Sequence, residues 1–227
     1  NRLVIGCGYL GLRVARHWVA EGRTVYAVTR SAALAGQLER EGIRPIRGDV
    51  AHPDSLGQLP AADSVLYALG YDPRGGASRR EVQVEGFRAV LGRLPARIGR
   101  ILYVSSTGVY GPAEGAWVDE ETPCRPTREA GQVILEAENL LTGHRLGARA
   151  VILRLAGLYG PGRIPKLSDV AQGRPVAAPA TGYLNLIHVE DAIRADIEDG
   201  APTNPDGSLN LVHYAAWLLK EIGRARD

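Results

Sequence analysis

Apolar residues in this chain gather in short runs, separated by stretches with helical spacing. The runs lie at 3–5, 24–29, 44–47, 64–69, 100–105 and 150–155, and the helical stretches at 12–21, 32–41, 81–94 and 129–142. Because the runs are apolar without alternation, both faces of each strand are expected to be covered. The pattern predicts an α/β fold with a doubly wound parallel sheet.

The texture of the sequence changes after Gly157, where glycine, proline and short segments replace the regular alternation. We therefore expect residues 1–156 to form the sheet with its helices. Residues 157–227 are expected to form a small substrate-side lobe that packs on it and does not fold independently. An apolar stretch near 210–226 predicts an amphipathic helix at the end of that lobe.

A glycine-spaced turn follows the first predicted strand. Gly6 permits a tight turn, Gly8 lets the backbone approach a pyrophosphate, and Gly11 lets the next helix pack closely on the strand. The helix N-terminus offers unpaired N–H groups and a positive dipole end to an anion. A glycine-rich corner of any α/β protein can carry the same letters, but strand, turn and helix in this order are typical of dinucleotide binding. Tyr9 and Leu10, inside the turn, are predicted to contact the cofactor too.

The end of the second predicted strand indicates which dinucleotide binds. Folds that select NAD place an acidic residue here to hold the ribose 2′-hydroxyl, whereas this chain has Thr29, Arg30 and Ser31. An arginine can instead pair with a 2′-phosphate, helped by a neighbouring hydroxyl. We therefore predict NADP(H) over NAD(H); the alternative is that Arg30 is a solvated surface residue. Asp49 and Val50, after the third strand, are expected near the adenine, although an Asp after Gly can equally be a turn or cap residue.

Composition restricts the partners. The chain has 227 residues, 45% of them hydrophobic, and its 27 basic and 25 acidic residues give a net charge of +2. This balance gives no reason to expect nucleic acid or an anionic membrane as a partner. The two cysteines form no metal-ligand pair and no disulfide framework. No apolar run approaches the roughly 20 residues of a membrane span and no leader pattern precedes the first strand, so a cytoplasmic protein without a metal is expected.

Three further motifs follow the glycine turn in order. They are YVSSTGVYG at 103–111, LAGLYGPG at 155–162 and LIHVEDA at 186–192. Together the four motifs closely resemble the extended short-chain dehydrogenase/reductases, the NAD(P)-dependent epimerase/dehydratase family, from residue 2 to about residue 199. The resemblance implies a Rossmann sheet of strand order 3-2-1-4-5-6-7, with the nicotinamide over the end of the fifth strand. It further implies cofactor contacts at Ala68, Leu69, Ser105, Leu158 and Tyr159.

The catalytic residues of that family are only partly present. Ser106 matches the serine that holds the substrate oxygen. The family's Tyr-x-x-x-Lys pair falls on Ala130 and Ile134, and its asparagine on Gln83; no Tyr or Lys lies between Trp117 and Arg149. In the family, the lysine supplies the adjacent cation that a phenol needs to work as an acid or base near neutral pH. Ala130 and Ile134 carry no ionisable group, so they cannot transfer protons. The pattern resembles the atypical members of the family.

Two interpretations of this departure remain open. In the first, the protein is an oxidoreductase or epimerase acting on a nucleotide-sugar-like or carbonyl substrate, with an acid or base from elsewhere. The candidates are Glu129, beside the missing tyrosine, then Arg128, Tyr110, Tyr159 and His188. In the second, it is a non-catalytic NADP(H)-binding redox sensor or regulatory protein. Glu129 can also be an ordinary carboxylate in the first turn of a helix, where the dipole favours it.

Some residues could serve the substrate. A proline-rich loop at 112–126 borders the substrate in this family, although it can also be a plain connection. Four basic residues could meet a diphosphate or carboxylate, or could simply be solvated surface: Arg154, Arg163, Lys166 and Arg174. Dimers are frequent in the family, so the resemblance leaves a homodimer open.

Overall fold

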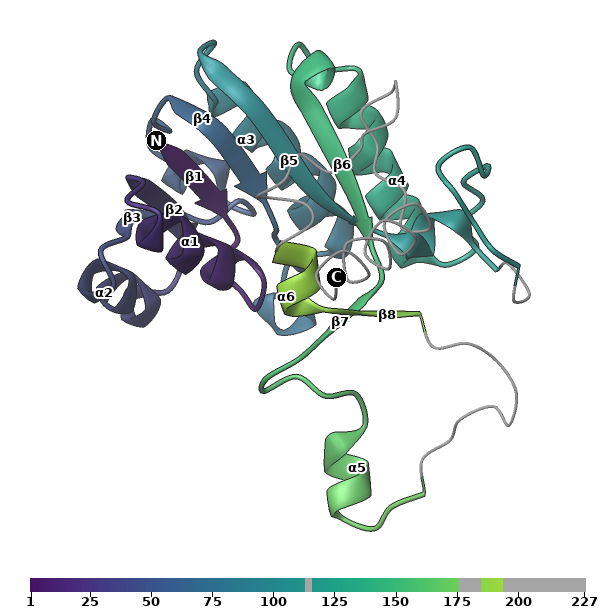
Figure 1. The fold of residues 1–227 in the computed structure, drawn as a ribbon. Helices are drawn as coiled ribbons and strands as arrows, with labels where there is room; N and C mark the ends of the chain where they lie inside the picture. The colour runs from purple at the N-terminus through teal and green to yellow at the C-terminus, as the bar shows by residue number, and fades with distance from the viewer. Residues whose placement is uncertain (113–115, 176–184, 194–227) are drawn as a thin grey trace, which may run out of the picture.

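The computed structural model describes residues 1–112, 116–175 and 185–193. Its centre is a parallel sheet of order β3-β2-β1-β4-β5-β6 (Figure 1). The strands are β1 (Arg2–Ile5), β2 (Val25–Thr29), β3 (Arg44–Arg47), β4 (Ala62–Tyr67), β5 (Ile98–Ser106) and β6 (Ala150–Leu155). This confirms the predicted α/β fold and the predicted order of these six strands; no seventh strand of this sheet lies within the described ranges.

The middle of the sheet is built from residues that are apolar on both faces. Leu3, Val4 and Ile5 of β1 are all fully buried, as their non-alternating pattern predicts. Ile5 is in register with Val28 of β2 and with Tyr67 of β4. Since all three strands are parallel, their carboxyl ends meet at one edge, where the loops that follow them come together.

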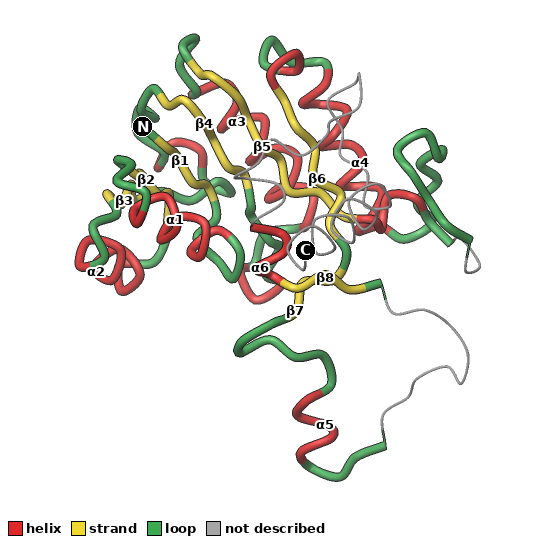
Figure 2. Tube along the Cα trace, viewed as in Figure 1, coloured by secondary structure: helices red, strands yellow, loops and turns green. Residues whose placement is uncertain are grey.

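Helices cover both faces of the sheet (Figure 2). The helices α1 (Gly11–Ala20), α2 (Ala32–Arg40) and α6 (Val189–Ile193) contribute to one buried cluster, and α3 (Gly86–Arg93) and α4 (Glu129–Thr142) to the other. The helix predicted at 81–94 consists of two pieces, a π-helical turn over Glu81–Glu85 and then α3. Gln83 and Val84 of that turn are buried against the sheet.

One predicted boundary is wrong in a way that bears on function. The run at 64–69 was expected to be strand throughout, but β4 ends at Tyr67. Ala68 keeps one backbone bond to the sheet, from its N–H to the Ile5 carbonyl at 2.8 Å. Both residues have left the strand to line a cavity described below.

The segment after β6 lies beyond the carboxyl ends of the central strands (Figure 1). There β7 (Gly157–Tyr159) and β8 (Leu186–His188) form a separate parallel pair, and α5 (Leu167–Ala171) extends away from the sheet. The helix predicted near 210–226 lies outside the described residues, so a lobe over 157–227 stays a prediction. Short helical turns complete the chain at Pro53–Ser55, Pro73–Gly75, Thr107–Tyr110 and Gly147–Arg149.

Within the described ranges, none of the helices has the length and apolar character needed to cross a membrane.

Candidate cofactor site

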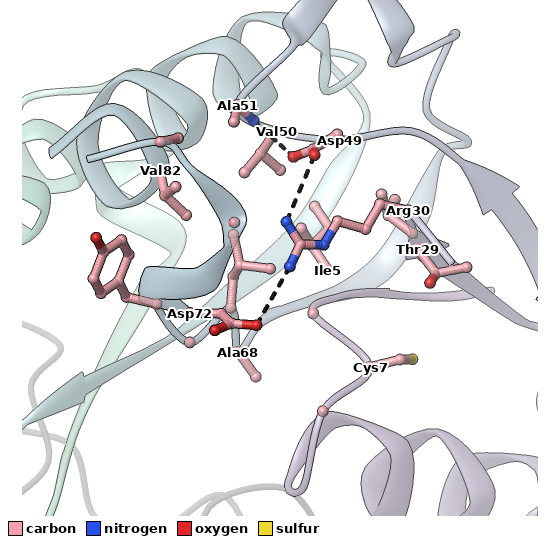
Figure 3. Close-up of a pocket in the computed structure, with 18 of the residues that line it drawn as sticks. Ile5, Cys7, Thr29, Arg30, Asp49, Val50, Ala51, Ala68, Asp72 and Val82 are labelled. Carbon is pink, nitrogen blue, oxygen red and sulfur yellow. Dashed lines mark hydrogen bonds and ion pairs between the residues drawn. The ribbon is translucent and has the colours of Figure 1, made fainter. Parts of the chain in front are cut away.

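A cavity of about 560 Å³ opens where the carboxyl ends of β1, β2, β3 and β4 meet (Figure 3). Its walls are the glycine turn, the end of β2, residues 48–51 after β3 and the loop that follows β4. Ligands of open α/β sheets bind at this edge, next to the strand where the order reverses. The predicted cofactor residues among those that line it are Gly6, Gly8, Thr29, Arg30, Asp49, Val50, Ala68 and Leu69.

The glycines of the turn have different roles. Gly6 has φ 96°, and a Cβ there would lie 2.7 Å from the backbone of Ala68. A Cβ on Gly11 would lie 2.1 Å from the Gly6 carbonyl oxygen. Both positions are therefore required by the fold itself. At Gly8, which borders the cavity, a Cβ would meet nothing within 4 Å. The fold itself therefore does not require glycine there, whereas a ligand that approaches the backbone would.

The N-terminus of α1 directly follows the glycine turn that borders the cavity, and the N–H of Leu12 donates to the Gly8 carbonyl at 3.1 Å. The helix begins at Gly11, directly after the turn, and its N-cap residue Leu10 makes no side-chain capping bond. The first N–H groups of a helix have no partner inside the helix and attract anions. An uncapped terminus beside an open glycine backbone fits a bound diphosphate.

Arg30 reaches across the cavity from the end of β2 (Figure 3). Its guanidinium nitrogens lie 3.9 Å from Asp49 Oδ2 and 3.7 Å from Asp72 Oδ2, and its side chain is 53% exposed. Both distances exceed hydrogen-bond length, so charge attraction orients the group while its N–H donors remain available to a ligand. Arg30 therefore borders the predicted cofactor site, and it is also partly solvated.

The residues on either side of Arg30 fix the turn between β2 and α2. The Ser31 N–H donates to Thr29 Oγ1 at 3.2 Å, and Ser31 Oγ accepts from the N–H of Leu34 at 3.2 Å, which caps α2. Ser31 is exposed and can still donate its own hydroxyl proton, whereas Thr29 is buried. Ser31 is thus a capping residue in the first place, and its phosphate contact stays a prediction.

Asp49 forms a turn and also borders the cavity. Its Oδ1 accepts from the N–H of Ala51 at 3.0 Å, and its own N–H donates to Ser55 Oγ at 2.8 Å. This is the turn role that Gly-Asp also predicts. Because Oδ2 faces Arg30, one carboxylate links the loop after β3 to the end of β2.

The other predicted cofactor residues lie outside this cavity. Leu10 and Gly11 are buried. Tyr9 donates its hydroxyl to the Pro161 carbonyl at 3.2 Å. Leu158 and Tyr159 belong to β7, and the Tyr159 ring stands edge-on to His188 with ring centroids 5.1 Å apart. Their cofactor contacts remain predictions.

Ser105 belongs to a buried polar cluster. Its hydroxyl donates to the Glu138 carboxylate, which is 2% exposed. Arg154 donates to Glu138 Oε2 at 2.8 Å and to the Tyr110 hydroxyl at 3.1 Å. The side chain of Ser105 is therefore used inside the protein, and a cofactor contact from this residue would have to come from its backbone.

This cluster also determines the protonation of Tyr110. Burial raises the pKa of the Tyr110 phenol, and the hydrogen bond from Arg154 opposes that rise only in part. Burial alone would lower the pKa of Arg154, but its bonds to Glu138 and Tyr110 prevail and raise it. Tyr110 therefore sits beside a cation without becoming a phenol that ionises near neutral pH.

A comparison with protein families fits this geometry. The model of the NAD-dependent epimerase/dehydratase family matches residues 2–197. The chain belongs to this family. Among curated proteins, this epimerase/dehydratase family member is 34% identical over 199 residues to Protein YeeZ of Escherichia coli K12, an alignment that covers 85% of the chain and 70% of YeeZ. It is 28% identical to the UDP-glucose 4-epimerase of Streptomyces lividans, over 96% of the chain and 77% of that enzyme.

Solved structures show the same fold. A putative NAD-dependent epimerase/dehydratase from Methylobacillus flagellatus superposes with a TM-score of 0.68 at 29% identity, covering 98% of this chain and 82% of that one. The dTDP-glucose 4,6-dehydratase DesIV from Streptomyces venezuelae superposes with a TM-score of 0.73, over 98% of this chain and 81% of that one. At 18% identity the second likeness concerns the fold alone.

The positions predicted for catalysis lie at the end of β5 and at the start of α4. Ser106 is the last residue of β5, and its Oγ accepts from the N–H of Gly108 at 3.1 Å, which leaves its proton free to donate. Glu129 is the first residue of α4 and is exposed. Ala130 and Ile134, the residues predicted to stand at the family's tyrosine and lysine positions, follow one turn apart on that helix.

Sequence reasoning missed the part of the site that follows Leu69. Tyr71, Asp72 and Arg74 line the cavity, and Asp72 is one of the two carboxylates beside Arg30. The sequence showed only a loop rich in glycine and arginine. Its position directly after a central strand was the available signal, because such loops open at the ligand-binding edge.

Proposed function

We propose that this protein binds NADP(H) in the cavity at the ends of β1, β2 and β4. The observation that carries the proposal is the open backbone of Gly8 under an uncapped helix terminus, with Arg30 across the same cavity. Membership of an NAD-dependent family supports it. A bound nicotinamide would supply hydride transfer, and the protein would supply its orientation.

The preference for the phosphorylated cofactor rests on Arg30. No carboxylate lies at residues 29–31 to hold a ribose 2′-hydroxyl. The guanidinium is already oriented, and it is held by Asp49 and Asp72 at distances that leave its donors unused. A 2′-phosphate can form paired charge-assisted bonds with such a group, which are stronger than these two loose ion pairs.

The test compares Arg30→Ala with Arg16→Ala. Arg16 pairs with Glu41 away from the cavity, so both variants lose one positive charge and only the first changes the site. Isothermal titration calorimetry should show NADPH affinity falling about 10- to 100-fold in Arg30→Ala, which corresponds to the roughly 1.5–3 kcal/mol of a bond to a charged group. NADH affinity should change little, and Arg16→Ala should bind both as the wild type does. An equal fall for both cofactors, or none, would overturn the assignment of Arg30 to the 2′-phosphate.

For the reaction, we propose reduction or epimerisation of a carbonyl or nucleotide-sugar-like substrate, with Ser106 holding the substrate oxygen. The free hydroxyl proton of Ser106 supports this role, and the UDP-glucose 4-epimerase among the relatives supports the substrate class. Glu129 is the proposed acid or base, because it is exposed and precedes the position where the family carries tyrosine.

A non-catalytic NADP(H)-dependent sensor is the second candidate. The observation that favours it is that Ala130 and Ile134 replace the proton-transferring pair. Tyr110, the phenol beside a cation, has a raised pKa and does not restore the lost function.

Turnover separates the two functions. The protein is mixed with NADPH and a panel of nucleotide sugars, carbonyls and enones, and the absorbance of the reduced nicotinamide is followed. Sustained oxidation that is lost in Ser106→Ala and reduced in Glu129→Gln, while NADPH still binds both variants, supports the enzyme. Binding of NADPH without oxidation, together with binding of a partner protein that depends on the redox state of NADP, supports the sensor.

A further inference from the structure

A tight turn after β7 fixes the direction of Arg163. The N–H of Gly160 donates to the Arg163 carbonyl at 3.1 Å, and the N–H of Arg163 donates back to the Gly160 carbonyl at 2.9 Å. Pro161 and Gly162 occupy the two central positions, and Gly162 has φ 76°, a conformation that favours glycine. The turn is thus closed at both ends, which fixes the backbone from which the Arg163 side chain extends.

This turn is attached to the glycine turn of β1, although the two are far apart in sequence. The Pro161 carbonyl accepts from the Tyr9 hydroxyl at 3.2 Å and from an Arg13 nitrogen at 3.1 Å. The other terminal nitrogen of Arg13 donates to the Tyr9 carbonyl at 2.8 Å. Tyr9 and Arg13 therefore bind the segment after β7 to the place where a diphosphate is expected.

Of the four basic residues singled out in the sequence, only Arg163 lines the cavity. Arg154 is bound to the buried Glu138. Arg174 and Lys166 both pair with Asp169, at 2.7 and 3.9 Å. Within the described ranges no ion pair joins Arg163 to a carboxylate, and its guanidinium carbon lies 5.3 Å from the centre of the Tyr9 ring.

Three arginines line the cavity, and Arg74 is already paired with Asp72 at 2.9 Å. The other two approach from different elements. Arg30 comes from the end of β2 and lies between Asp49 and Asp72. Arg163 comes from the segment after β7 and lies beside Tyr9, which is a residue of the glycine turn. A dinucleotide phosphorylated on its ribose carries its negative charge in two places, so two separate cations match it.

We propose that Arg163 binds the diphosphate of the dinucleotide, with Tyr9 and the turn Gly160–Arg163 as the support that positions it. The inference rests on the proposed function, since it requires a dinucleotide in this cavity. The glycine turn and the helix terminus contribute N–H groups with partial charge, and Arg163 adds a full positive charge. The segment after β7 then takes part in cofactor binding itself.

The test uses two probes that each carry one of the two phosphate groups. ADP-ribose has the diphosphate without a 2′-phosphate, and adenosine 2′-phosphate has the reverse. Arg163→Ala should weaken ADP-ribose and NADPH about 10-fold or more, as expected for the loss of a charge-assisted bond, and leave adenosine 2′-phosphate unchanged. Arg30→Ala should show the opposite pattern with these two probes.

Lys166→Ala is the matched control, because it removes a nearby positive charge outside the cavity. Tyr9→Phe keeps the ring and removes the bond to Pro161, so ADP-ribose should weaken by less than in Arg163→Ala. Wild-type affinity for ADP-ribose in Arg163→Ala, or an equal loss in Lys166→Ala, would refute the role of Arg163 while the cofactor site stands. If the wild type binds neither NADPH, NADH nor ADP-ribose, the proposed function itself fails, and the role of Arg163 falls with it.

Discussion

The substitution Gly8→Ala separates cofactor binding from folding. A Cβ at Gly8 would meet no protein atom within 4 Å, whereas at Gly11 it would lie 2.1 Å from a backbone oxygen. Gly8 borders the cavity and is exposed. The added methyl group therefore enters the space proposed for the diphosphate without disturbing the packed protein.

The size of the effect follows from the bonds that the methyl group prevents. If the diphosphate is held away from the backbone, about two charge-assisted hydrogen bonds are lost, each worth roughly 1.5–3 kcal/mol. We expect NADPH to bind Gly8→Ala at least about 100-fold more weakly, a change of roughly 3 kcal/mol. Stability should stay the same or rise by about 0.4–1 kcal/mol, because alanine restricts the unfolded chain.

Calorimetric titration with NADPH and thermal unfolding without ligand measure the two quantities. Gly36→Ala is the matched control, since a Cβ there also meets nothing within 4 Å and the residue lies in α2 away from the cavity. It should gain stability and keep its NADPH affinity. Wild-type affinity in Gly8→Ala would refute the placement of the diphosphate, and a large fall in its unfolding temperature would show that the methyl group has no free space.

Two further predictions concern buried groups. Glu138→Leu leaves the Arg154 guanidinium without a carboxylate inside the protein, so urea unfolding should show that the free energy of unfolding falls by about 3–5 kcal/mol. Glu136→Leu, on the same helix but in an exposed ion pair, should lower it by less than about 1 kcal/mol. Equal losses in the two variants would contradict this. Burial raises the pKa of the Cys7 thiol to about 12. In a Cys124→Ser variant, a thiol reagent at pH 8 should therefore label Cys7 only after unfolding, and labelling of the native protein should accelerate only as the pH rises toward that value. Rapid labelling of the native protein at pH 8 would contradict the burial of Cys7.

Local features of the site could be predicted from the sequence because neighbouring residues create them. The glycine turn depends on the conformation of Gly6 and on the approach of Gly11 to the strand, and both act within a few residues. Arg30 lies beside the cavity because the end of a strand and the start of a helix fix its position, and its contact with a cofactor stays a prediction. The apolar runs predicted the sheet for the same reason, since a strand that is buried on both faces is apolar at consecutive positions.

Contacts between distant segments could not be predicted. Asp72 beside Arg30, and Pro161 beside Tyr9, depend on how separate loops meet at the sheet edge. Arg154 was a candidate for ligand binding, and the structure instead places it on Glu138 inside the protein. Arg154 lies in an apolar predicted strand and Arg163 directly after a glycine-proline motif, but neither setting identifies the group that the side chain meets. Only the folded chain shows which of the two reaches the cavity.

Both proposed functions, the enzyme and the sensor, require that the cavity binds NADP(H). Ala130 and Ile134 stand at the positions predicted for the proton-transferring pair, whereas Gly6, Gly8 and Arg30 line the cavity proposed for the cofactor. An enzyme with another acid or base and a sensor of NADP redox state would both retain such a site. Binding of the cofactor is therefore the first property to measure.

The most direct measurement is a calorimetric titration of the wild-type chain with NADPH and, separately, with NADH. We expect one site per chain that binds NADPH about 10-fold or more tightly than NADH, because only the 2′-phosphate makes the bond to Arg30. Tighter binding of NADH would contradict the choice of cofactor, and no binding of either would contradict the site.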